Sequence, residues 1–491
     1  MSNSITGLTR RKLLLGTAAL GAAATAGVLV FGQSSKAAGH IQSSNPLKIP
    51  PLEAGRMQGN TRIYDLDIQH GQTEFFGGMK APTMGINGSY LGPVLRMRQD
   101  EDIRINVTNS LDETATLHWH GFNLPAIADG GPHQIINPGS TWSPEFKVLE
   151  KASTMWYHSH LMGKTAEHVW AGIAGMIIVD DEPSSALDLP NNYGVDDLPV
   201  ALQDRRFLRD GTMPYAPTMH DNMMGKIGDT PMANGTIGAW FDTTTSLVRL
   251  RLLNASNGSI YSIGFSDGRF FKKIATDGGL LAAPVDVQLM SMGPGERAEI
   301  VVDLSDGKNV TLTHFVRISQ SEVSPEFAFL ELRPAANSTT SKPVPATLAT
   351  LPPLNPEAAT NTRRFDLDMR GMMGMGMGGG GFMINGEQMD MKVINHTIKK
   401  DTVEIWEIRN LSRMSHPFHV HNTQFRILDR DGRPPEPHED GLKDTVLVLP
   451  GRSARILISF NHYTDEKVPY MYHCHILEHE DAGMMGQFTV V

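Results

Sequence analysis

The chain has 491 residues, of which 40% are hydrophobic and 20% are charged, with 48 glycines and 30 prolines. At about 150 residues per domain this length predicts roughly three domains, and the composition excludes a coiled coil, a collagen-like chain and a wholly disordered protein. The formal net charge of −10 at pH 7 disfavours nucleic acid as a partner, because its phosphates carry the same sign.

The first 38 residues have the pattern of an export signal. Arg10-Arg11-Lys12 precedes an uncharged stretch rich in Ala and Gly, and Ser35-Lys36-Ala37 is suited to signal-peptidase cleavage. We therefore expect residues 1–38 to be a leader for the twin-arginine (Tat) export machinery, and the protein to be periplasmic or otherwise exported, without a stable membrane anchor. The alternative is a retained anchor, because residues 13–35 are long enough to span a bilayer, although they are only weakly apolar.

Beyond the leader, short runs that alternate apolar and polar residues dominate the sequence. Period-two runs between Gly and Pro turns predict β-sandwiches or Greek-key barrels. A stretch rich in Pro, Thr and Ala predicts an extended linker over residues 336–358. We expect an all-β chain with domains at residues 45–182, 195–335 and 359–491. The clearest predicted strands are residues 102–107, 247–252 and 402–408.

An internal repeat connects the first and last thirds of the chain. MWYHSHL at residues 155–161 resembles MYHCHIL at 471–477, and LHWHG at 117–121 parallels PFHVHN at 417–422. The middle third has a similar strand and turn texture but none of these histidines. Three related β-domains, with a chemistry shared by the first and the third, explain this pattern.

The repeat contains four His-x-His pairs, whereas 19 randomly placed histidines give about 0.7 such pairs. Side chains at i and i+2 of a strand point to the same face, and imidazole suits copper, zinc and iron. Hydrogen-bonded core or surface histidines are the alternative for any single pair, but four pairs in a repeated setting favour metal binding. The predicted ligands are His118, His120, His158, His160, His419, His421, His473 and His475.

The single cysteine lies inside one of these pairs, so no intrachain disulfide exists. On a strand, the two imidazoles of residues 473–475 face one way and the thiol of Cys474 faces the other, so one strand can join two metal sites. A blue-copper site uses two His, one Cys and a weak axial Met. Taken alone, Cys474 could instead be a buried apolar filler. The candidate set is His416, Cys474, His479 and Met484, in which His416 has the opposite parity to His419 and His421.

These motifs resemble those of the multicopper oxidases, in the three-domain form of periplasmic cuprous oxidases and bacterial laccases. The matching segments are HWHG (118–121), WYHSH (156–160), HPFHVHN (416–422) and HCHILEHEDAGMM (473–485). The resemblance implies three cupredoxin-like domains and four copper ions. It assigns His416, Cys474, His479 and Met484 to type 1 copper, His118 and His419 to type 2, and His120, His158, His160, His421, His473 and His475 to the two type 3 ions.

The resemblance also implies roles for two carboxylates. Asp129 and Glu480 match positions where the family places acids near the copper cluster, which predicts proton delivery. The alternatives are a solvated turn for Asp129 and a hydrogen-bond partner of a ligand for Glu480. The reaction implied is one-electron oxidation of a reductant, coupled to four-electron reduction of dioxygen to water, by a protein that we expect to be monomeric.

A methionine-rich segment bears on the substrate. Residues 369–391 contain 8 Met among 23 residues, interleaved with Gly. Thioethers prefer Cu(I), which favours a cuprous oxidase in copper tolerance; the alternative for the segment is a flexible Gly-rich loop. Two other functions are a laccase-like oxidase of phenols or aryl amines and, less favoured, a copper-free structural protein of the cell envelope. The candidate ligands of substrate copper are Met372, Met373, Met375, Met377 and Met414.

Overall fold

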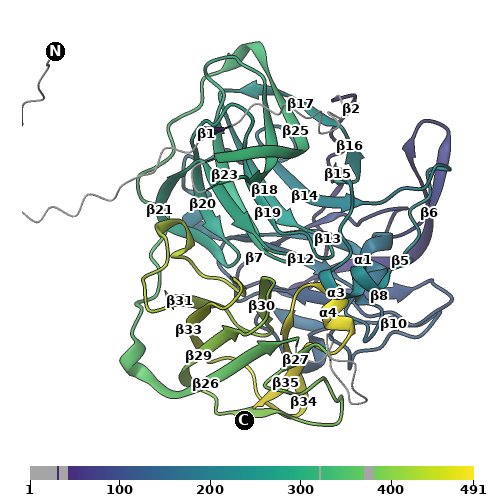
Figure 1. The fold of residues 1–491 in the computed structure, drawn as a ribbon, viewed down its shortest axis with the longest axis vertical. Coiled ribbons are helices and arrows are strands. Elements are labelled where there is room, and N and C mark those ends of the chain that lie inside the picture. Colours follow the sequence, from purple (N-terminus) through teal and green to yellow (C-terminus); the bar gives the residue numbers. More distant parts are fainter. Residues whose placement is uncertain (1–29, 32–42, 320–321, 370–380) are drawn as a thin grey trace, which may run out of the picture.

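The computed structural model describes residues 30–31, 43–319, 322–369 and 381–491. Strands predominate over helices in the described residues and form six sheets, arranged in three pairs (Figure 1). The three predicted strands are present as β8 (Asp102–Asn109), β18 (Leu247–Asn254) and β29 (Thr402–Asn410). Along β8 every second residue is buried, as the alternating pattern requires. The all-β prediction is confirmed.

The first pair of sheets lies in residues 52–180 and encloses one hydrophobic core, which includes Trp119 and Tyr157. One sheet contains β4 (Arg56–Gln58), β5 (Thr61–Phe76), β6 (Met79–Ile86), β8, β10 (Thr141–Trp142) and β11 (Glu145–Lys147). The other has the order β3 (Leu52–Glu53), β7 (Val94–Arg98), β13 (Ala174–Asp180), β12 (Ser153–His158) and β9 (His118–His120).

The second pair encloses a core built from the middle of the chain. One sheet has the order β2 (Asn45–Pro46), β17 (Ala239–Thr245), β25 (Glu322–Thr339), β24 (Val310–Arg317), β19 (Tyr261–Phe265) and β22 (Leu289–Met292), and β1 (Val30–Phe31) pairs with β25. The other has the order β16 (Thr236–Ile237), β15 (Thr230–Ala233), β14 (Asp197–Arg205), β18, β23 (Arg297–Asp303), β20 (Phe271–Thr276) and β21 (Gly279–Val287). Strand β25 thus continues into the stretch expected to be a linker.

The third pair encloses a core that contains Trp406 and Cys474. One sheet has the order β27 (Met383–Ile384), β26 (Ala359–Asp368), β29, β33 (Ser453–Phe460) and β31 (Phe425–Arg430). The other has the order β28 (His396–Ile398), β35 (Met485–Val490), β34 (Asp465–Cys474), β30 (His416–Val420) and β32 (Thr445–Val448).

Helices are short and lie in the connections. The α-helices are α1 (Thr165–Ala171), α2 (Glu182–Ser185), α3 (Met219–Met224) and α4 (Leu477–Asp481), and the 3-10 turns are η1 (Ala126–Ala128), η2 (Pro356–Ala358) and η3 (Pro437–Glu439). Among the described residues, no helix has the length and apolar character needed to cross a membrane. Apart from residues 30–31, the predicted leader lies outside the described residues.

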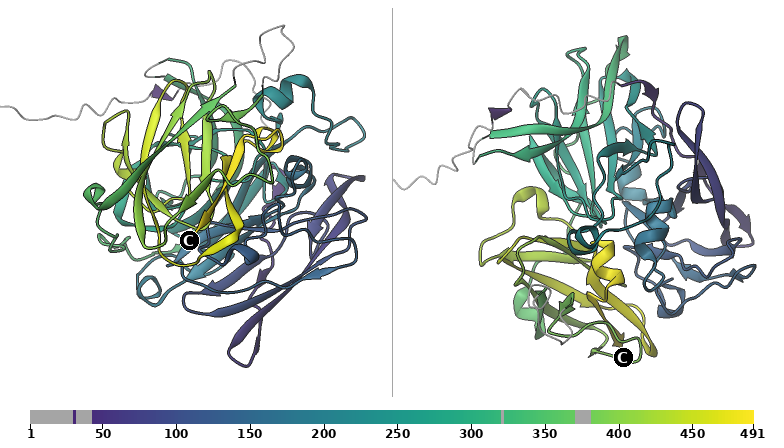
Figure 2. Two further views of the ribbon diagram at one scale, coloured as in Figure 1. Left: turned by 90° about the horizontal axis from the view of Figure 1, so that it is seen from below. Right: turned by 45° about the vertical axis from the view of Figure 1, so that its right-hand side comes forward.

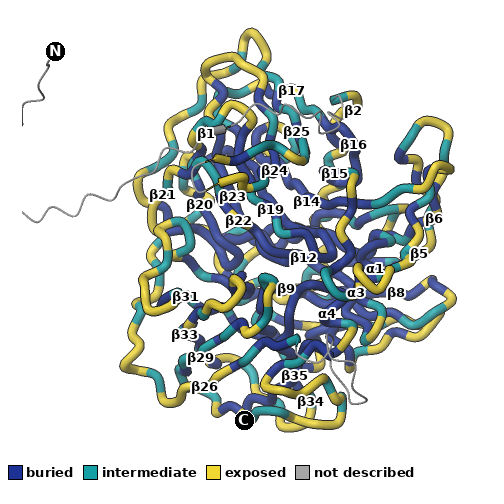
Figure 3. Tube along the Cα trace, viewed as in Figure 1, coloured by how far each residue is buried: buried dark blue, intermediate teal, exposed yellow. Residues whose placement is uncertain are grey.

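The sequence repeat corresponds to a repeated strand arrangement. In the first domain β12 lies between β13 and β9, and in the third β34 lies between β35 and β30, all antiparallel. The register aligns His118 with His158 in the first case and His419 with His473 in the second. Two views in Figure 2 show the three domains packed against one another. The chain around β9 and β12 is buried where the domains meet (Figure 3).

Candidate metal centres

The predicted type 1 residues form a compact buried cluster in the third domain. Nδ1 of His416, at the start of β30, lies 3.3 Å from Sγ of Cys474, at the end of β34. Nδ1 of His479, in α4, lies 3.7 Å from the same sulfur. The backbone of Met484 bonds to Cys474 and to His479, and its side chain is buried in the same core. All four candidates are therefore brought together.

The electrostatics of this cluster suit a thiophilic cation. Burial raises the pKa of the Cys474 thiol and lowers the pKa of His416 to about 3, so without metal both groups are uncharged. A bound cation reverses the preference of the thiol, because coordination displaces its proton. Two neutral imidazoles and a thiolate are the equatorial ligands of a blue-copper site.

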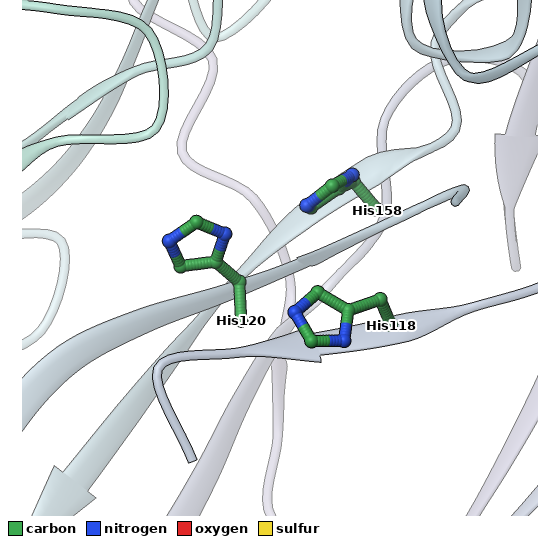
Figure 4. Close-up of side chains that lie close together, drawn as sticks. All are labelled: His118, His120 and His158. Atoms are coloured by element: carbon green, nitrogen blue, oxygen red, sulfur yellow. The ribbon is translucent and has the colours of Figure 1, made fainter. Parts of the chain in front are cut away.

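The eight histidines of the four pairs converge between the first and third domains. The rings of His118 and His421 stack with centroids 3.9 Å apart, and those of His120 and His419 with centroids 3.7 Å apart. Figure 4 shows His118 and His120 of β9 beside His158 of β12, the three of them close enough to share an ion. A second group joins His160 and His421 to His473, whose Nε2 lies 3.2 Å from Nε2 of each.

The pairs are not presented by regular strands alone. Strand β12 ends at His158, β30 at Val420 and β34 at Cys474, so the second histidine of three pairs lies beyond its strand. At His475, for example, the backbone N–H donates to the carbonyl of Pro417 (2.7 Å). The strand alternation assumed from the sequence thus holds within β9, while the chain leaves the strand at the other three pairs.

The histidine nitrogens that face the interior have the character of metal ligands. Nε2 of His118, His158 and His419 is buried and has no hydrogen-bond partner among the described residues, and neither nitrogen of His475 has one. An unpaired buried polar atom costs about 1–3 kcal/mol. Meanwhile Nδ1 of His118 and Nδ1 of His419 bond to the backbone carbonyls of Asp129 (2.8 Å) and Asp444 (2.9 Å). One nitrogen fixed by the protein and one left free is how proteins orient histidine ligands, so these residues fit a cluster of copper ions.

The two predicted acids lie at this cluster. The two carboxylate oxygens of Glu480 lie 3.2 Å from Nδ1 of His160 and 3.2 Å from Nδ1 of His473. Oδ2 of Asp129 lies 2.8 Å from Nδ1 of His421. Both acids are buried, so Asp129 is not a solvated turn residue.

The two acids differ in how burial acts on them. Burial raises the pKa of Asp129 well above its usual range. Burial also raises the pKa of Glu480, but the attraction of His160 and His473 outweighs it, so that pKa is lowered overall. Burial therefore favours the protonated form of Asp129, whereas the attraction of the two histidines favours the ionised form of Glu480.

A third buried acid, Asp444, was missed by the sequence analysis. Its Oδ1 lies 3.0 Å from Nε2 of His120, and it groups with His120 and His419. It follows Lys443, and neither residue two positions away is an acid or a histidine, so the sequence shows no paired ligand at this point. The only signal is a charged pair directly before the apolar strand β32.

The methionine candidates are only partly covered by the structure. Met372, Met373, Met375 and Met377 lie outside the described residues. The ring of Phe382 stacks on His479, with centroids 4.2 Å apart. The carbonyl of Met414 accepts from Oγ of Ser412 (3.1 Å), and that hydroxyl lies 2.8 Å from Nε2 of His416. Nε2–H of His479 donates to the carbonyl of Met223 in α3 (3.1 Å), a contact that the sequence did not indicate.

Two clusters of buried imidazoles on β-domains, joined through one cysteine, define a copper-binding oxidase of the cupredoxin type. The comparisons agree: the family described as "Multicopper oxidase" matches residues 67–184 and 353–491. The chain belongs to the multicopper oxidase family and is an oxidase.

Individual relatives extend the similarity along the chain. "Multicopper oxidase mco" of Staphylococcus aureus is 35% identical over 91% of this chain and 93% of its own length. "Cell division protein FtsP" of Escherichia coli (strain K12) is 34% identical over 98% and 99%. Among solved structures, a laccase-like multi-copper oxidase CueO from Ochrobactrum sp., described as having oxidase activity towards lignin model compounds and lignosulfonate, is 36% identical, with a TM-score of 0.83 over 91% of this chain and 100% of that one.

The buried imidazoles predict an acid-sensitive apoprotein. Burial lowers the pKa of His118, His160 and His416 from 6.5 to about 3. Between these values the unfolded chain binds more protons than the folded chain, so the free energy of unfolding falls as the pH falls. At pH 5 each such residue costs about 2 kcal/mol. The Tm of the copper-free protein, measured by calorimetry, should drop steeply from pH 7 to pH 5.

Two variants serve as controls for this measurement. His416→Gln should flatten the pH dependence, because one buried imidazole is removed, whereas His220→Gln should not, because His220 is exposed. A Tm of the copper-free protein that is constant from pH 7 to pH 5 contradicts the assignment of these histidines as neutral and buried.

Proposed function

We propose that this protein is an exported oxidase that withdraws single electrons from Cu(I) and uses them to reduce dioxygen to water, in copper tolerance. Export follows from the twin-arginine leader at residues 1–38, and a monomer is the working form. The observation that supports Cu(I) best is that Nε2 of both type 1 histidines reaches the backbone of a methionine: Nε2 of His479 bonds to the carbonyl of Met223, and Nε2 of His416 lies against Oγ of Ser412, which bonds to the carbonyl of Met414. A thioether carried by these segments would be available to Cu(I) next to the type 1 site.

The proposed copper sites follow the clusters described above. Type 1 copper is held by His416, Cys474, His479 and Met484, type 2 by His118 and His419, and the type 3 pair by His120, His158, His160, His421, His473 and His475. Copper, when bound, supplies the one-electron redox steps that the reduction of dioxygen to two waters requires. Burial of all ten histidines and of Cys474 keeps bulk water away from both sites.

The chain itself connects the two sites. The outer site is the cluster of His416, Cys474, His479 and Met484, and the inner site is the cluster formed by the eight histidines of the four pairs. Cys474 is bonded in sequence to His473 and His475, so the thiol of the outer site and two imidazoles of the inner site are joined by covalent bonds. In space the sulfur contacts His416, while Nε2 of His473 faces the inner histidines. This arrangement supports the transfer of electrons along residues 473–475.

Asp129 and Glu480 are the proposed proton-transfer groups. Asp129 bonds to His421, and Glu480 lies against His160 and His473, so each carboxyl group is next to a proposed ligand without being one. Burial raises the pKa of Asp129 well above its usual range, which favours the protonated form of this carboxyl group in the buried site. Protons can thus be held close to the place where oxygen is reduced.

A laccase-like oxidation of phenols or aryl amines is the second candidate. It is favoured by the similarity to the laccase-like oxidase from Ochrobactrum sp.. An organic reductant needs only an approach to the edge of His416 or His479, and a ring such as that of Phe382 already stacks on His479. The relative named for cell division favours a copper-free envelope role, but a scaffold has no need for unpaired buried imidazole nitrogens, which lower its stability.

Loss of the thiol should abolish the type 1 site. In Cys474→Ser, the intense visible charge-transfer band of the copper–thiolate bond should vanish together with oxidase activity, because no thiolate remains. Met484→Leu should keep the band, since the axial thioether tunes the site rather than building it. Visible absorption of the copper-saturated proteins is the measurement, and circular dichroism checks the fold. A wild-type protein that is saturated with copper but has no band disproves the assignment.

Removal of the proton donors should slow oxygen reduction without loss of copper. Asp129→Asn and Glu480→Gln keep every ligand, and each removes a proton-transfer group, which is worth about 10²–10⁴-fold in rate. Stopped-flow reoxidation of the fully reduced enzymes measures the effect. Glu478→Gln is the matched control, because this buried acid on the same helix contacts Asn257 and Tyr215 instead of the histidines. Wild-type reoxidation by the double variant would show that neither acid delivers protons.

The methionine segment should determine the choice between the two substrate classes. Replacing Met372, Met373, Met375 and Met377 with Leu keeps the chain length but removes the thioethers. We expect kcat/KM for Cu(I) to fall by about tenfold relative to kcat/KM for a phenol, because only Cu(I) needs a soft ligand. A folding defect lowers both values alike and leaves their ratio unchanged. An unchanged ratio with wild-type values of both favours the laccase-like function.

A further inference from the structure

Arg297 is a fully buried arginine that the middle domain directs toward the histidine cluster. It is the first residue of β23, and its side chain has no solvent exposure. All five N–H groups of its guanidinium have acceptors: Nε donates to the carbonyl of Thr154, Nη1 to Gly295 and Asp444, and Nη2 to Asp277 and Asp444. A guanidinium with every donor used is held in a single orientation.

The carboxylate of Asp444 connects Arg297 to the histidines. Its Oδ1 accepts from Nη1 of Arg297 (2.8 Å) and lies 3.0 Å from Nε2 of His120. Its Oδ2 accepts from Nη2 of Arg297, so the pair is bidentate. The backbone carbonyl of Asp444 also bonds to Nδ1 of His419 (2.9 Å). One residue thus contacts a histidine of the first domain, a histidine of the third and an arginine of the second.

His120 is presented differently from the neighbouring histidines. Among the described residues, Nδ1 of His118 and of His419 has a partner and Nε2 has none. In His120 it is Nε2 that is engaged, by Asp444 and more distantly by Oγ1 of Thr445 (3.3 Å), while Nδ1 has no partner in the same residues. A carboxylate oxygen accepts hydrogen bonds, so the proton of His120 is placed on Nε2 and the lone pair on Nδ1.

The salt bridge is itself supported by neighbouring charges. Asp277 accepts from the backbone N–H of Arg297 (2.8 Å) and pairs with Nζ of Lys443 (2.8 Å), the residue before Asp444. Lys443 also pairs with Glu296 (3.1 Å). All of these groups are buried, so loss of one partner leaves an uncompensated charge in the interior. The position of Asp444 is therefore set largely by residues of the middle domain.

We propose that Arg297 is a positioning residue of the oxygen-reducing centre: by holding Asp444 it fixes Nδ1 of His120 toward the cluster. The middle domain, which provides none of the proposed ligands, thereby takes part in building the copper site. This inference rests on the proposed function in one respect, that His120 binds copper. It adds a residue of the second domain to the residues of the first and third domains that form the histidine cluster.

The test compares copper binding by three purified proteins. Arg297→Gln removes the bidentate pair. Arg249→Gln is the matched control, because Arg249 is also a buried arginine of the middle domain, paired with Glu299 at a site without histidines. Affinity for the copper ions of the inner cluster is measured by competition with a chelator, and the visible band of the type 1 site serves as an internal reference.

We expect Arg297→Gln to bind inner copper about 10- to 100-fold more weakly, the usual effect of losing a residue that orients a ligand, and to keep its type 1 band. Arg249→Gln should match the wild type. Equal affinity in Arg297→Gln and Arg249→Gln overturns the proposal, as does an equal loss in both, which would show a general weakening of the domain.

A second variant covers the case in which Arg297→Gln does not fold. Arg297→Lys keeps the buried charge but lacks the planar fork that pairs with both oxygens of Asp444 in one orientation. Weaker inner copper binding by Arg297→Lys, with the type 1 band retained, supports the proposal, and wild-type binding refutes it. If the wild-type protein itself binds no copper at the inner histidines, the proposed function fails, and that result is distinct from failure of this inference.

Discussion

The structure depends on one constraint: ten imidazoles are kept in the interior, and several of their nitrogens have no hydrogen-bond partner in the part of the chain that the structure describes. Such atoms destabilise a folded chain unless a ligand satisfies them. The surrounding groups are arranged to preserve this state rather than relieve it. Backbone carbonyls of Asp129 and Asp444 engage the opposite nitrogens of His118 and His419, which prevents the rings from turning toward other partners.

The same constraint explains why the histidine cluster is assembled from more than one domain. A single β-domain can present only a few imidazoles on one sheet, so the cluster is assembled where β9 and β12 of the first domain meet β30 and β34 of the third. Such an interface places side chains from distant parts of the chain within 3.2 Å of one another, as at His160 and His473. The middle domain packs against β12 and contributes Arg297, whose bonds to Thr154 and Asp444 connect all three domains.

Electrostatics separates the outer site from the inner one. The outer site is nearly uncharged without metal, with a thiol and two neutral imidazoles in an apolar core. The inner site is bordered by the buried carboxyl groups of Asp129, Glu480 and Asp444, which can hold protons and, when ionised, compensate bound cations. The electron transfer proposed for the outer site suits the first environment, and the reduction of dioxygen proposed for the inner site suits the second.

Much of the candidate site could be predicted from local sequence, because strand alternation and close spacing bring ligands together without knowledge of the fold. The four His-x-His pairs, Cys474 and His416 are recognisable from their spacing alone, and the structure brings these residues together, although strand alternation orients both members of a pair only at β9. The all-β fold follows from the same periodicity. Asp129 and Glu480 came from the family resemblance, and both lie at the histidines.

Only the tertiary structure revealed Arg297, Asp444 and the contact between Met223 and His479. Arg297 and Asp444 are separated by 147 residues, and Met223 and His479 by 256, so no local period or motif relates them. It also showed that three of the four pairs extend past the ends of their strands, since the packing of loops decides where a strand stops. The identity of the candidate ligands is thus encoded locally, whereas their orientation depends on buried polar contacts between domains, which exist only once the chain has folded.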